Sequence, residues 1–346
     1  MESQPLSALI LAAGKGTRMK STMAKVLHEV HFRPMIHHVI DAVSSLDFGT
    51  IIVVTGHQAE QVEAACAGYN VIFARQQEQL GTGHAVLAAE AELARSGGVV
   101  MILCGDTPLI GADTLRRMLH QHLQRRSVLS VMTTIVDDPT HYGRIIEDAQ
   151  GHVVAIVEEK DATPEQRKIK KINAGIYCVD VSFLLHTLKG VGSNNKQGEV
   201  YLTDIVAKAH SAGYDTTSFL CLCADETLGV NSRMELARAH QFIQNKVNEK
   251  FMSAGVTLVL PATVTIGAAA TIGRDTVIDP GVYVKGETVI GENCRIGPGS
   301  CLIDCRIGDN VVLGAGCYIH GVTVAENTIL APHSRICGKL DEACFI

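Results

Sequence analysis

The chain has 346 residues, of which 47% are hydrophobic and 19% are charged, and its formal net charge is -6. This length allows two domains that each bury a core, and the apolar content excludes a disordered chain. The negative charge and the absence of Trp disfavour a nucleic-acid-binding protein.

The eleven cysteines include no Cys-x-x-Cys pair, which indicates reduced core residues in a cytoplasmic protein. The first apolar run has no basic segment before it and is too short for a signal peptide. No apolar segment approaches the ~20 residues that a membrane-spanning helix needs. We therefore expect a cytoplasmic protein that binds neither a membrane nor a nucleic acid.

The first motif follows an apolar run of strand length, residues 6–13. Two glycines end this run, and the chain then becomes cationic at Lys15, Arg18 and Lys25. A strand that ends in a Gly-rich loop before a helix directs backbone N–H groups at one point, which suits an anion. Met19 replaces the third glycine of a dinucleotide-binding fingerprint, and the P-loop spacing does not occur. A nucleotide phosphate is the expected ligand, and a plain strand-to-helix turn is the alternative.

Strand and helix patterns alternate through the next part of the chain. Apolar runs predict strands at 50–55, 71–74, 99–104, 127–136, 171–177 and 218–223, with a hairpin over 146–157. Helical patterns cover 35–46, 58–67, 85–93, 114–124 and 233–253. This alternation predicts an α/β fold with a doubly wound mixed sheet, in which ligands bind beyond the carboxyl ends of the strands.

Asp106 comes directly after the apolar run 99–104. A carboxylate at the carboxyl end of a central strand suits a hard cation such as Mg²⁺, which takes one or two protein oxygens together with substrate phosphates. The alternative is that Asp106 caps a helix beginning near Pro108.

Further short motifs follow the first loop in a fixed order. They are Gln76, LGTGHA (80–85), GDTPL (105–109), YGRI (142–145), IVE (156–158), NAG (173–175) and GVN (229–231). Together with LAAGKGTRM (11–19) they resemble the sugar nucleotidyltransferases, and most closely the N-acetylglucosamine-1-phosphate uridylyltransferases of the bacterial GlmU family. The resemblance is close over residues 6–250. Ala174 and Ala24 depart from it, because the family commonly has Thr and Pro at these positions.

The resemblance implies a Mg²⁺-dependent enzyme that forms UDP-N-acetylglucosamine and pyrophosphate from UTP and N-acetylglucosamine 1-phosphate. It assigns the catalytic roles to Arg18, Lys25 and Asp106. It assigns nucleotide contacts to Leu11, Ala12, Ala13, Gly14, Lys15, Gly16, Gln76, Gly81, Thr82 and Gly105. It assigns substrate contacts to Gly143, Glu158, Asn173 and Asn231. The metal ligands it implies are Asp106 and Asn231.

The chemistry of these side chains agrees with such roles. The amide of Gln76 both donates and accepts, so it can pair with the carbonyl and N–H edge of uracil. Glu158 can accept a hydrogen bond from a sugar hydroxyl, a charge-assisted bond worth ~1.5–3 kcal/mol. Lys25 would stabilise the two phosphates being joined, and Arg18 and Lys15 would offset charge on the leaving pyrophosphate.

The C-terminal part has a six-residue period. Apolar residues recur at Leu260, Ile266, Ile272, Ile278, Val284, Ile290, Ile296 and Leu302. One step then shortens to five, and the pattern weakens from Val322. This period predicts a parallel β-helix, and its resemblance is to the left-handed hexapeptide-repeat fold, whose members commonly pack as homotrimers.

The resulting domains are a nucleotidyltransferase domain at 1–232, a linker helix at 233–254 and a left-handed β-helix at 255–346. The resemblance does not extend to the complete acetyltransferase region of the two-function family members. The β-helix is therefore expected to serve assembly, with His320 and His333 at turns rather than in acetyl transfer.

Three alternatives remain open. The same chemistry could act on another sugar 1-phosphate, such as that of glucose or N-acetylmuramic acid, or on dTTP. The chain could be a non-catalytic trimeric scaffold that binds a nucleotide sugar, although the presence of both Lys25 and Asp106 disfavours this. The repeat could also carry an acyltransferase activity.

Overall fold

The computed structural model describes residues 4–338. Contacts divide the chain into two compact units, Met1–Leu236 and Ala237–Ile346. The division falls inside α9 (Arg233–Ser253), a helix with the bounds that the sequence indicated.

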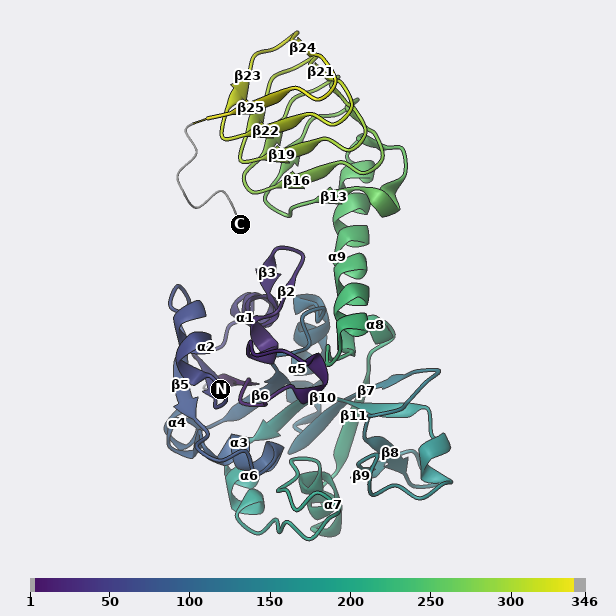
Figure 1. Ribbon diagram of the computed structural model, residues 1–346. Coiled ribbons are helices and arrows are strands. Elements are labelled where there is room, and N and C mark those ends of the chain that lie inside the picture. The colour runs from purple at the N-terminus through teal and green to yellow at the C-terminus, as the bar shows by residue number, and fades with distance from the viewer. Residues whose placement is uncertain (1–3, 339–346) are drawn as a thin grey trace. The chain divides into compact units, whose positions relative to one another are not determined.

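The first unit is built on a nine-stranded sheet with the order β11-β7-β10-β6-β1-β4-β5 and a β8–β9 hairpin beside β10 (Figure 1). The strands are β1 (Leu6–Leu11), β4 (Thr50–Thr55), β5 (Ile72–Arg75), β6 (Val99–Cys104), β7 (Leu129–Ile135), β8 (Arg144–Glu147), β9 (Val153–Val157), β10 (Lys171–Asp180) and β11 (Thr216–Leu220). The four strands β6, β1, β4 and β5 are parallel, whereas β10 is antiparallel to both β6 and β7. The predicted doubly wound mixed sheet is confirmed.

Eight α-helices accompany this sheet within the described part of the unit. They are α1 (Met35–Ser44), α2 (Ala59–Ala65), α3 (Thr82–Leu87), α4 (Glu90–Ser96), α5 (Ala112–Arg125), α6 (Val181–Leu188), α7 (Asp204–Ser211) and α8 (Ala224–Thr227). The single helix predicted over 85–93 is wrong, because two helices, α3 and α4, occupy that region. A small separate hairpin joins β2 (Glu29–Val30) to β3 (Arg33–Pro34).

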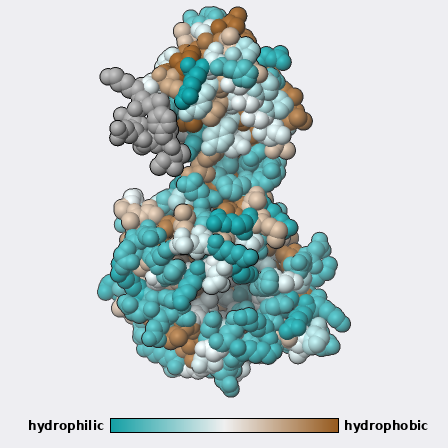
Figure 2. All heavy atoms as spheres, viewed as in Figure 1, coloured by the Kyte–Doolittle hydropathy of each residue, from teal (hydrophilic) through white to brown (hydrophobic). Residues whose placement is uncertain are grey.

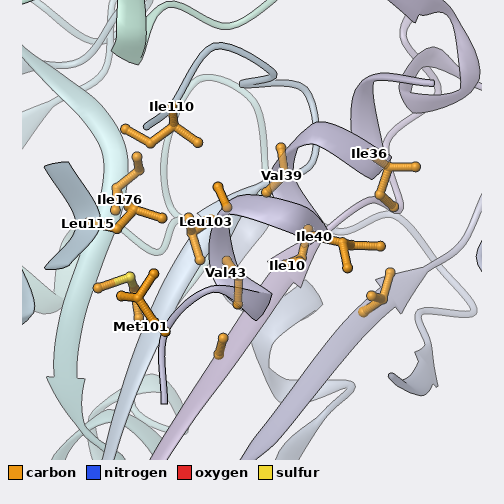
Figure 3. Packing of buried hydrophobic residues seen from close by; sticks show 14 of the residues in the cluster. Ile10, Ile36, Val39, Ile40, Val43, Met101, Leu103, Ile110, Leu115 and Ile176 are labelled. Carbon is orange, nitrogen blue, oxygen red and sulfur yellow. The ribbon is translucent and has the colours of Figure 1, made fainter. Parts of the chain in front are cut away.

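Apolar side chains cover both faces of the sheet. In β1, Ala8 and Ile10 belong to the cluster that includes α1 and α5, whereas Leu9 belongs to the cluster on the opposite face. Successive residues of a strand point to opposite faces, so a strand covered on both sides must be a continuous apolar run. Figure 3 shows the first cluster, in which Val39 and Ile40 of α1 pack with residues of β1 and β6.

The segment after β1 differs from the helix that the sequence predicted. Two one-turn 3-10 helices follow, η1 (Thr17–Met19) and η2 (Lys25–Leu27). Gly16 (φ 61°) and Lys20 (φ 48°) bracket η1 in the left-handed region, so the turn cannot extend into an α-helix.

The second unit is a left-handed parallel β-helix (Figure 1). Each of its three sheets consists of strands from successive coils. Its strands are β12 (Thr257–Leu258), β13 (Thr265–Ile266), β14 (Thr271–Ile272), β15 (Val277–Ile278), β16 (Tyr283–Lys285), β17 (Val289–Ile290), β18 (Arg295–Ile296), β19 (Cys301–Ile303), β20 (Arg306–Ile307), β21 (Val312–Leu313), β22 (Tyr318–His320), β23 (Thr323–Val324), β24 (Ile329–Leu330) and β25 (Arg335–Cys337). A 3-10 turn, η4 (Pro261–Thr263), precedes β13.

One corner of this β-helix absorbs the shortened repeat. Tyr283 pairs with Cys301, 18 residues later, but Cys301 pairs with Tyr318, 17 residues later. The missing residue lies in the turn between β19 and β20, which has two residues where the turn between β16 and β17 has three. Although the six-residue pattern weakens in the sequence from Val322, β23, β24 and β25 continue all three sheets, in agreement with the β-helix predicted over this region. His333 lies at a turn with a φ of 61°, as expected, whereas His320 does not, because it is the last residue of strand β22.

The visible face of the first unit is mostly hydrophilic, with isolated apolar side chains (Figure 2). Within residues 4–338, no helix is both long and apolar enough to span a bilayer. The described cysteines all have free thiols.

Buried His122 of α5 makes the stability of the first unit depend on pH. Its Nδ1 lies 2.8 Å from Ser130 Oγ, and the residue is 1% exposed. Burial lowers the pKa of His122 from 6.5 to about 4, with Asp180 partly opposing the shift. The unfolded chain therefore binds more protons between these values, and stability is lost as the pH falls from 6.5 towards 4.

We expect His122→Asn to reduce this pH dependence. The difference in unfolding free energy between pH 7 and pH 4.5 should shrink by about 2 kcal/mol relative to the unmodified chain. Urea unfolding followed by circular dichroism at the two pH values measures it. Identical pH dependence in the two proteins would contradict the assignment.

Candidate active site

Four neighbouring parallel strands bring the expected nucleotide contacts to one edge of the sheet. The segment after β1 is held there by a bond from Ala12 N to Val54 O (2.8 Å) and one from Gly105 N to Leu11 O (2.9 Å). Gln76 follows β5, and its N donates to Thr55 O (2.8 Å). Leu11 to Gly16, Gln76 and Gly105 therefore lie at the carboxyl ends of adjacent strands, where ligands of α/β sheets bind.

The loop glycine Gly16 makes room for Lys25. A Cβ built at Gly16 would lie 2.6 Å from the Cβ of Lys25, so any larger residue would collide with the lysine stem. The positive φ of Gly16 gives a second reason for glycine here. Lys15 and Arg18 are exposed on the same loop, and Arg18 is close enough to Tyr142 to influence its pKa.

Lys25, Asp106 and Asn231 meet at one point, although 81 and 206 residues separate the lysine from the other two. The Lys25 ammonium forms an ion pair with Asp106 Oδ2 and donates to Asn231 Oδ1 (2.8 Å). The pair is largely shielded, with side chains 14% and 16% exposed. A bond from Val230 N to Asp106 O (2.8 Å) holds the two segments together.

Asp106 does not cap the following helix, which was the alternative to metal binding, and the helix that follows Asn231 is capped by another residue. Helix α5 begins only at Ala112, with Gly111 at its N-cap. At the start of α9, Ser232 Oγ accepts from Glu235 N (3.2 Å), so Ser232 caps the helix. Glu235 itself accepts from Asn231 N (2.7 Å), which fixes the backbone of the asparagine.

The oxygens of Asp106 and Asn231 fit a divalent cation. Both face the position that the Lys25 ammonium occupies, so a positive charge is already accommodated between them. A carboxylate and a neutral amide oxygen are ligands that Mg²⁺ accepts while phosphates and waters complete its shell. Among the described residues, no group of three or more His, Cys, Asp and Glu forms a separate metal site.

The base-binding residue expected at Gln76 is held by its neighbours. Its Nε2 donates to Gly81 O (3.2 Å) and to His84 Nδ1 (3.0 Å). Both N–H bonds thus have protein acceptors, and in this arrangement the amide presents only its oxygen to a base. Gly81 has a φ of 112°, and a Cβ there would lie 2.5 Å from Val200 O. Thr82 Oγ1 accepts from Leu202 N (3.0 Å).

Gly143, Glu158 and Asn173 come together from three segments. A Cβ built at Gly143 would lie 3.6 Å from both Glu158 Oε1 and the Cβ of Asn173. Asn173 N donates to Gly143 O (2.9 Å), and the asparagine side chain is held by Gly175 N (3.0 Å) and the Tyr177 hydroxyl (2.7 Å). Burial raises the pKa of Glu158, and Thr203 Oγ1 donates to its carboxylate (3.1 Å).

Cys104 lies between these two groups of side chains. Burial, together with the charges of Asp106 and Glu158 and against the opposing charge of Lys25, raises the pKa of its thiol to about 12. Cys104 Sγ lies 3.8 Å from Gly175 O, and Gly175 N donates to Asn173 Oδ1, so the end of β6 that leads to Asp106 adjoins the Glu158 cluster. The site thus has a cationic part next to a part rich in hydrogen-bonding groups.

Sequence reasoning missed residues that support this site. His84 was given no chemical role, yet it holds Gln76. Thr203 was not singled out, and Arg144 was noted only within a motif. The sequence does not signal these roles, because each depends on contacts that only the fold brings about, from His84 to Gln76 eight residues earlier to Thr203 and Glu158, 45 residues apart.

Comparisons with known proteins agree with the geometry. A family described as "MobA-like NTP transferase domain" matches residues 8–163, and "Bacterial transferase hexapeptide (six repeats)" matches residues 269–303 and 304–338. A crystal structure of a putative glucose-1-phosphate thymidylyltransferase from Bacillus anthracis has a TM-score of 0.56 at 22% identity, covering 68% of this chain and 94% of that chain. This likeness supports the fold.

Three curated relatives carry the name "Bifunctional protein GlmU". That of Halalkalibacterium halodurans is 44% identical over 95% of this chain and 72% of its own length. That of Desulfotalea psychrophila is 44% identical over 96% of this chain and 98% of its own length. That of Heliobacterium modesticaldum is 48% identical over 89% of this chain and 67% of its own length. The chain belongs to the GlmU family and is a nucleotidyltransferase.

Proposed function

We propose that the chain forms UDP-N-acetylglucosamine and pyrophosphate from UTP and N-acetylglucosamine 1-phosphate. The meeting of Lys25, Asp106 and Asn231 beside Gly143, Glu158 and Asn173 carries this proposal. A cation-lined position adjoining a cluster of hydrogen-bonding groups suits a phosphate that is joined to a sugar. The membership of the GlmU family and the transferase domain support the same reaction.

In the proposed mechanism, an oxygen of the sugar 1-phosphate attacks the α-phosphorus of UTP in line, and pyrophosphate leaves. The P–O bond to pyrophosphate breaks as the new P–O bond forms, so no protein nucleophile is needed. The Lys25 ammonium stabilises the equatorial oxygens, and the exposed Lys15 and Arg18 offset the charge of the leaving group. The oxygen of Gln76 accepts from the base, and Glu158 accepts from a sugar hydroxyl.

Nucleotidyltransferases of this kind generally use a divalent metal ion, and we propose Mg²⁺ held by Asp106 and Asn231. When bound, this ion supplies charge neutralisation for the phosphate groups of the substrates. The role of this chain's own residues is to present the two oxygens and to keep them oriented through Val230, Gly229 and Glu235.

We also propose that the chain forms a homotrimer through its β-helix. The sheet containing β21 and β24 places Val312 and Ile329 in register, and these apolar side chains are 37% and 77% exposed. Apolar columns of this kind are buried where copies associate. A monomeric mass in solution would contradict the trimer.

Pyrophosphate release tests the function. The chain is mixed with UTP, N-acetylglucosamine 1-phosphate and Mg²⁺, and parallel reactions contain dTTP or glucose 1-phosphate instead of one substrate. We expect the highest kcat/KM for UTP with N-acetylglucosamine 1-phosphate. A higher value for another sugar 1-phosphate or for dTTP would change the substrate assignment, and no release from any pair would refute nucleotidyl transfer.

A further inference from the structure

Arg144 is a buried cation that the proposed mechanism does not use. It begins β8 and is 1% exposed, the most voluminous fully buried side chain among the described residues. Arginine is almost never fully buried unless its charge and its donors are paired. Its position therefore depends on specific partners.

The guanidinium of Arg144 joins three separate groups. Its Nη1 donates to the carbonyl oxygen of Tyr142. Its Nε and Nη2 donate to the carbonyl oxygen of Arg167, at 3.4 and 3.3 Å, in the 3-10 helix η3 (Gln166–Lys168). Its Nη2 also lies 2.5 Å from Glu159 Oε2. One planar group thus fixes two loops and a carboxylate.

These partners are the chain neighbours of two residues in the proposed sugar site. Tyr142 directly precedes Gly143, and Glu159 directly follows Glu158. The consecutive carboxylates have different partners, because Glu158 accepts from Thr203 whereas Glu159 pairs with Arg144. The same guanidinium therefore holds the segments that carry Gly143 and Glu158.

We propose that Arg144 is a positioning residue that sets the spacing of Gly143 and Glu158 and thereby the affinity for the sugar 1-phosphate. It acts through Tyr142 and Glu159 and does not touch the substrate. The inference rests on the proposed function, because it assigns a role at the same sugar site.

The chemistry of the guanidinium explains why arginine stands here. Its rigid fork directs several N–H groups at once, whereas a lysine is a single point charge with fewer fixed directions. Arg144→Lys keeps the positive charge beside Glu159 but cannot reach both carbonyl oxygens in the same geometry. Arg144→Met removes every bond and leaves the Glu159 carboxylate without its cation.

The test measures separate KM values for N-acetylglucosamine 1-phosphate and UTP in Arg144→Lys, Arg144→Met and Glu159→Gln. We expect the sugar KM to rise about tenfold in Arg144→Met and less in the other two, because small displacements of positioning groups are costly. The KM for UTP should stay within about twofold, since the contacts of Arg144 described above are with Tyr142, Arg167 and Glu159 rather than with the nucleotide loops.

Lys171→Met is the matched control. It removes an ion pair of the same length, 2.5 Å from Lys171 Nζ to Glu147 Oε1, at the other end of β8. Neither KM should change in this variant. If Arg144→Met does not fold, as judged by circular dichroism, Glu159→Gln still removes the charge partner and decides the outcome.

A sugar KM that is unchanged in the folded variants, or an equal rise in both KM values, would overturn the positioning role. Calorimetric binding of UDP-N-acetylglucosamine separates this result from a failure of the proposed function. If the unmodified chain binds that nucleotide sugar without turnover, weaker binding in the Arg144 variants still supports the inference, and equal binding overturns it. If the unmodified chain neither binds nor turns over, both proposals fail.

Discussion

Asp106→Asn is expected to lower kcat/KM for pyrophosphate formation by about a thousandfold, equivalent to about 4 kcal/mol of transition-state stabilisation. The carboxylate of Asp106 is one of two oxygens that face the cation position, and it pairs with the Lys25 ammonium. The amide in the variant has nearly the same size but no charge, so packing is kept while the attraction for both cations is lost. Calorimetry without substrates should also show weaker Mg²⁺ binding.

Asp113→Asn is a suitable control for this experiment. The Asp113 side chain is 92% exposed and pairs with Arg116 in the first turns of α5. Removing its charge should alter neither turnover nor the melting curve. Turnover of the Asp106 variant within tenfold of the unmodified chain, with an unchanged Mg²⁺ affinity, would remove Asp106 from the metal site.

Much of the fold could be predicted because the pattern of apolar residues is tied to burial. Residues 50–55 form β4 as the β-branched run indicated, and the apolar run 99–104 forms β6 with both faces covered. The six-residue period likewise predicted the β-helix, including the shortened step near Asp304, because each inward position must be apolar.

Other elements could not be predicted because they depend on individual backbone angles. The left-handed conformation of Lys20 stops η1, and nothing in a lysine signals a positive φ. The helix pattern over 85–93 continues across Ala88 and Ala89, which are both good helix formers, so it did not reveal the break between α3 and α4 there. The pattern beyond Val322 weakened in sequence, yet stacking on the preceding coil extends the β-helix.

The candidate site was predictable where residues follow strand ends or carry a family motif. Lys25, Asp106 and Asn231 meet as proposed, and Gly143, Glu158 and Asn173 meet beside them. The supporting contacts were not predictable, because partners such as Gln76 and His84 or Arg144 and Glu159 are defined by the folded geometry. From the sequence, we expected the Gln76 amide both to donate to a base and to accept from it. In the folded chain its nitrogen instead donates to Gly81 O and His84 Nδ1.

Lys25→Met is expected to lower kcat by about two to three orders of magnitude, in the range found when one charge-stabilising donor is removed. The Lys25 ammonium is a side-chain cation that contacts both Asp106 and Asn231. Without it, the negative charge that develops on the transferred phosphate loses its nearest partner. Methionine retains most of the stem that packs against Gly16, so the loop should keep its shape.

The same variant should bind Mg²⁺ more tightly than the unmodified chain when substrates are absent. The Lys25 ammonium lies 2.8 Å from Asn231 Oδ1 and pairs with Asp106, so a metal ion must displace it to reach these two oxygens. Removing the competing cation should therefore raise metal affinity several-fold in calorimetry while catalysis falls, the opposite of the metal-binding result expected for Asp106→Asn. Lys20→Met, which removes an exposed cation of the same loop, should change neither quantity. Unaltered turnover, or a weaker Mg²⁺ affinity in Lys25→Met, would show that the lysine and the metal do not share one position.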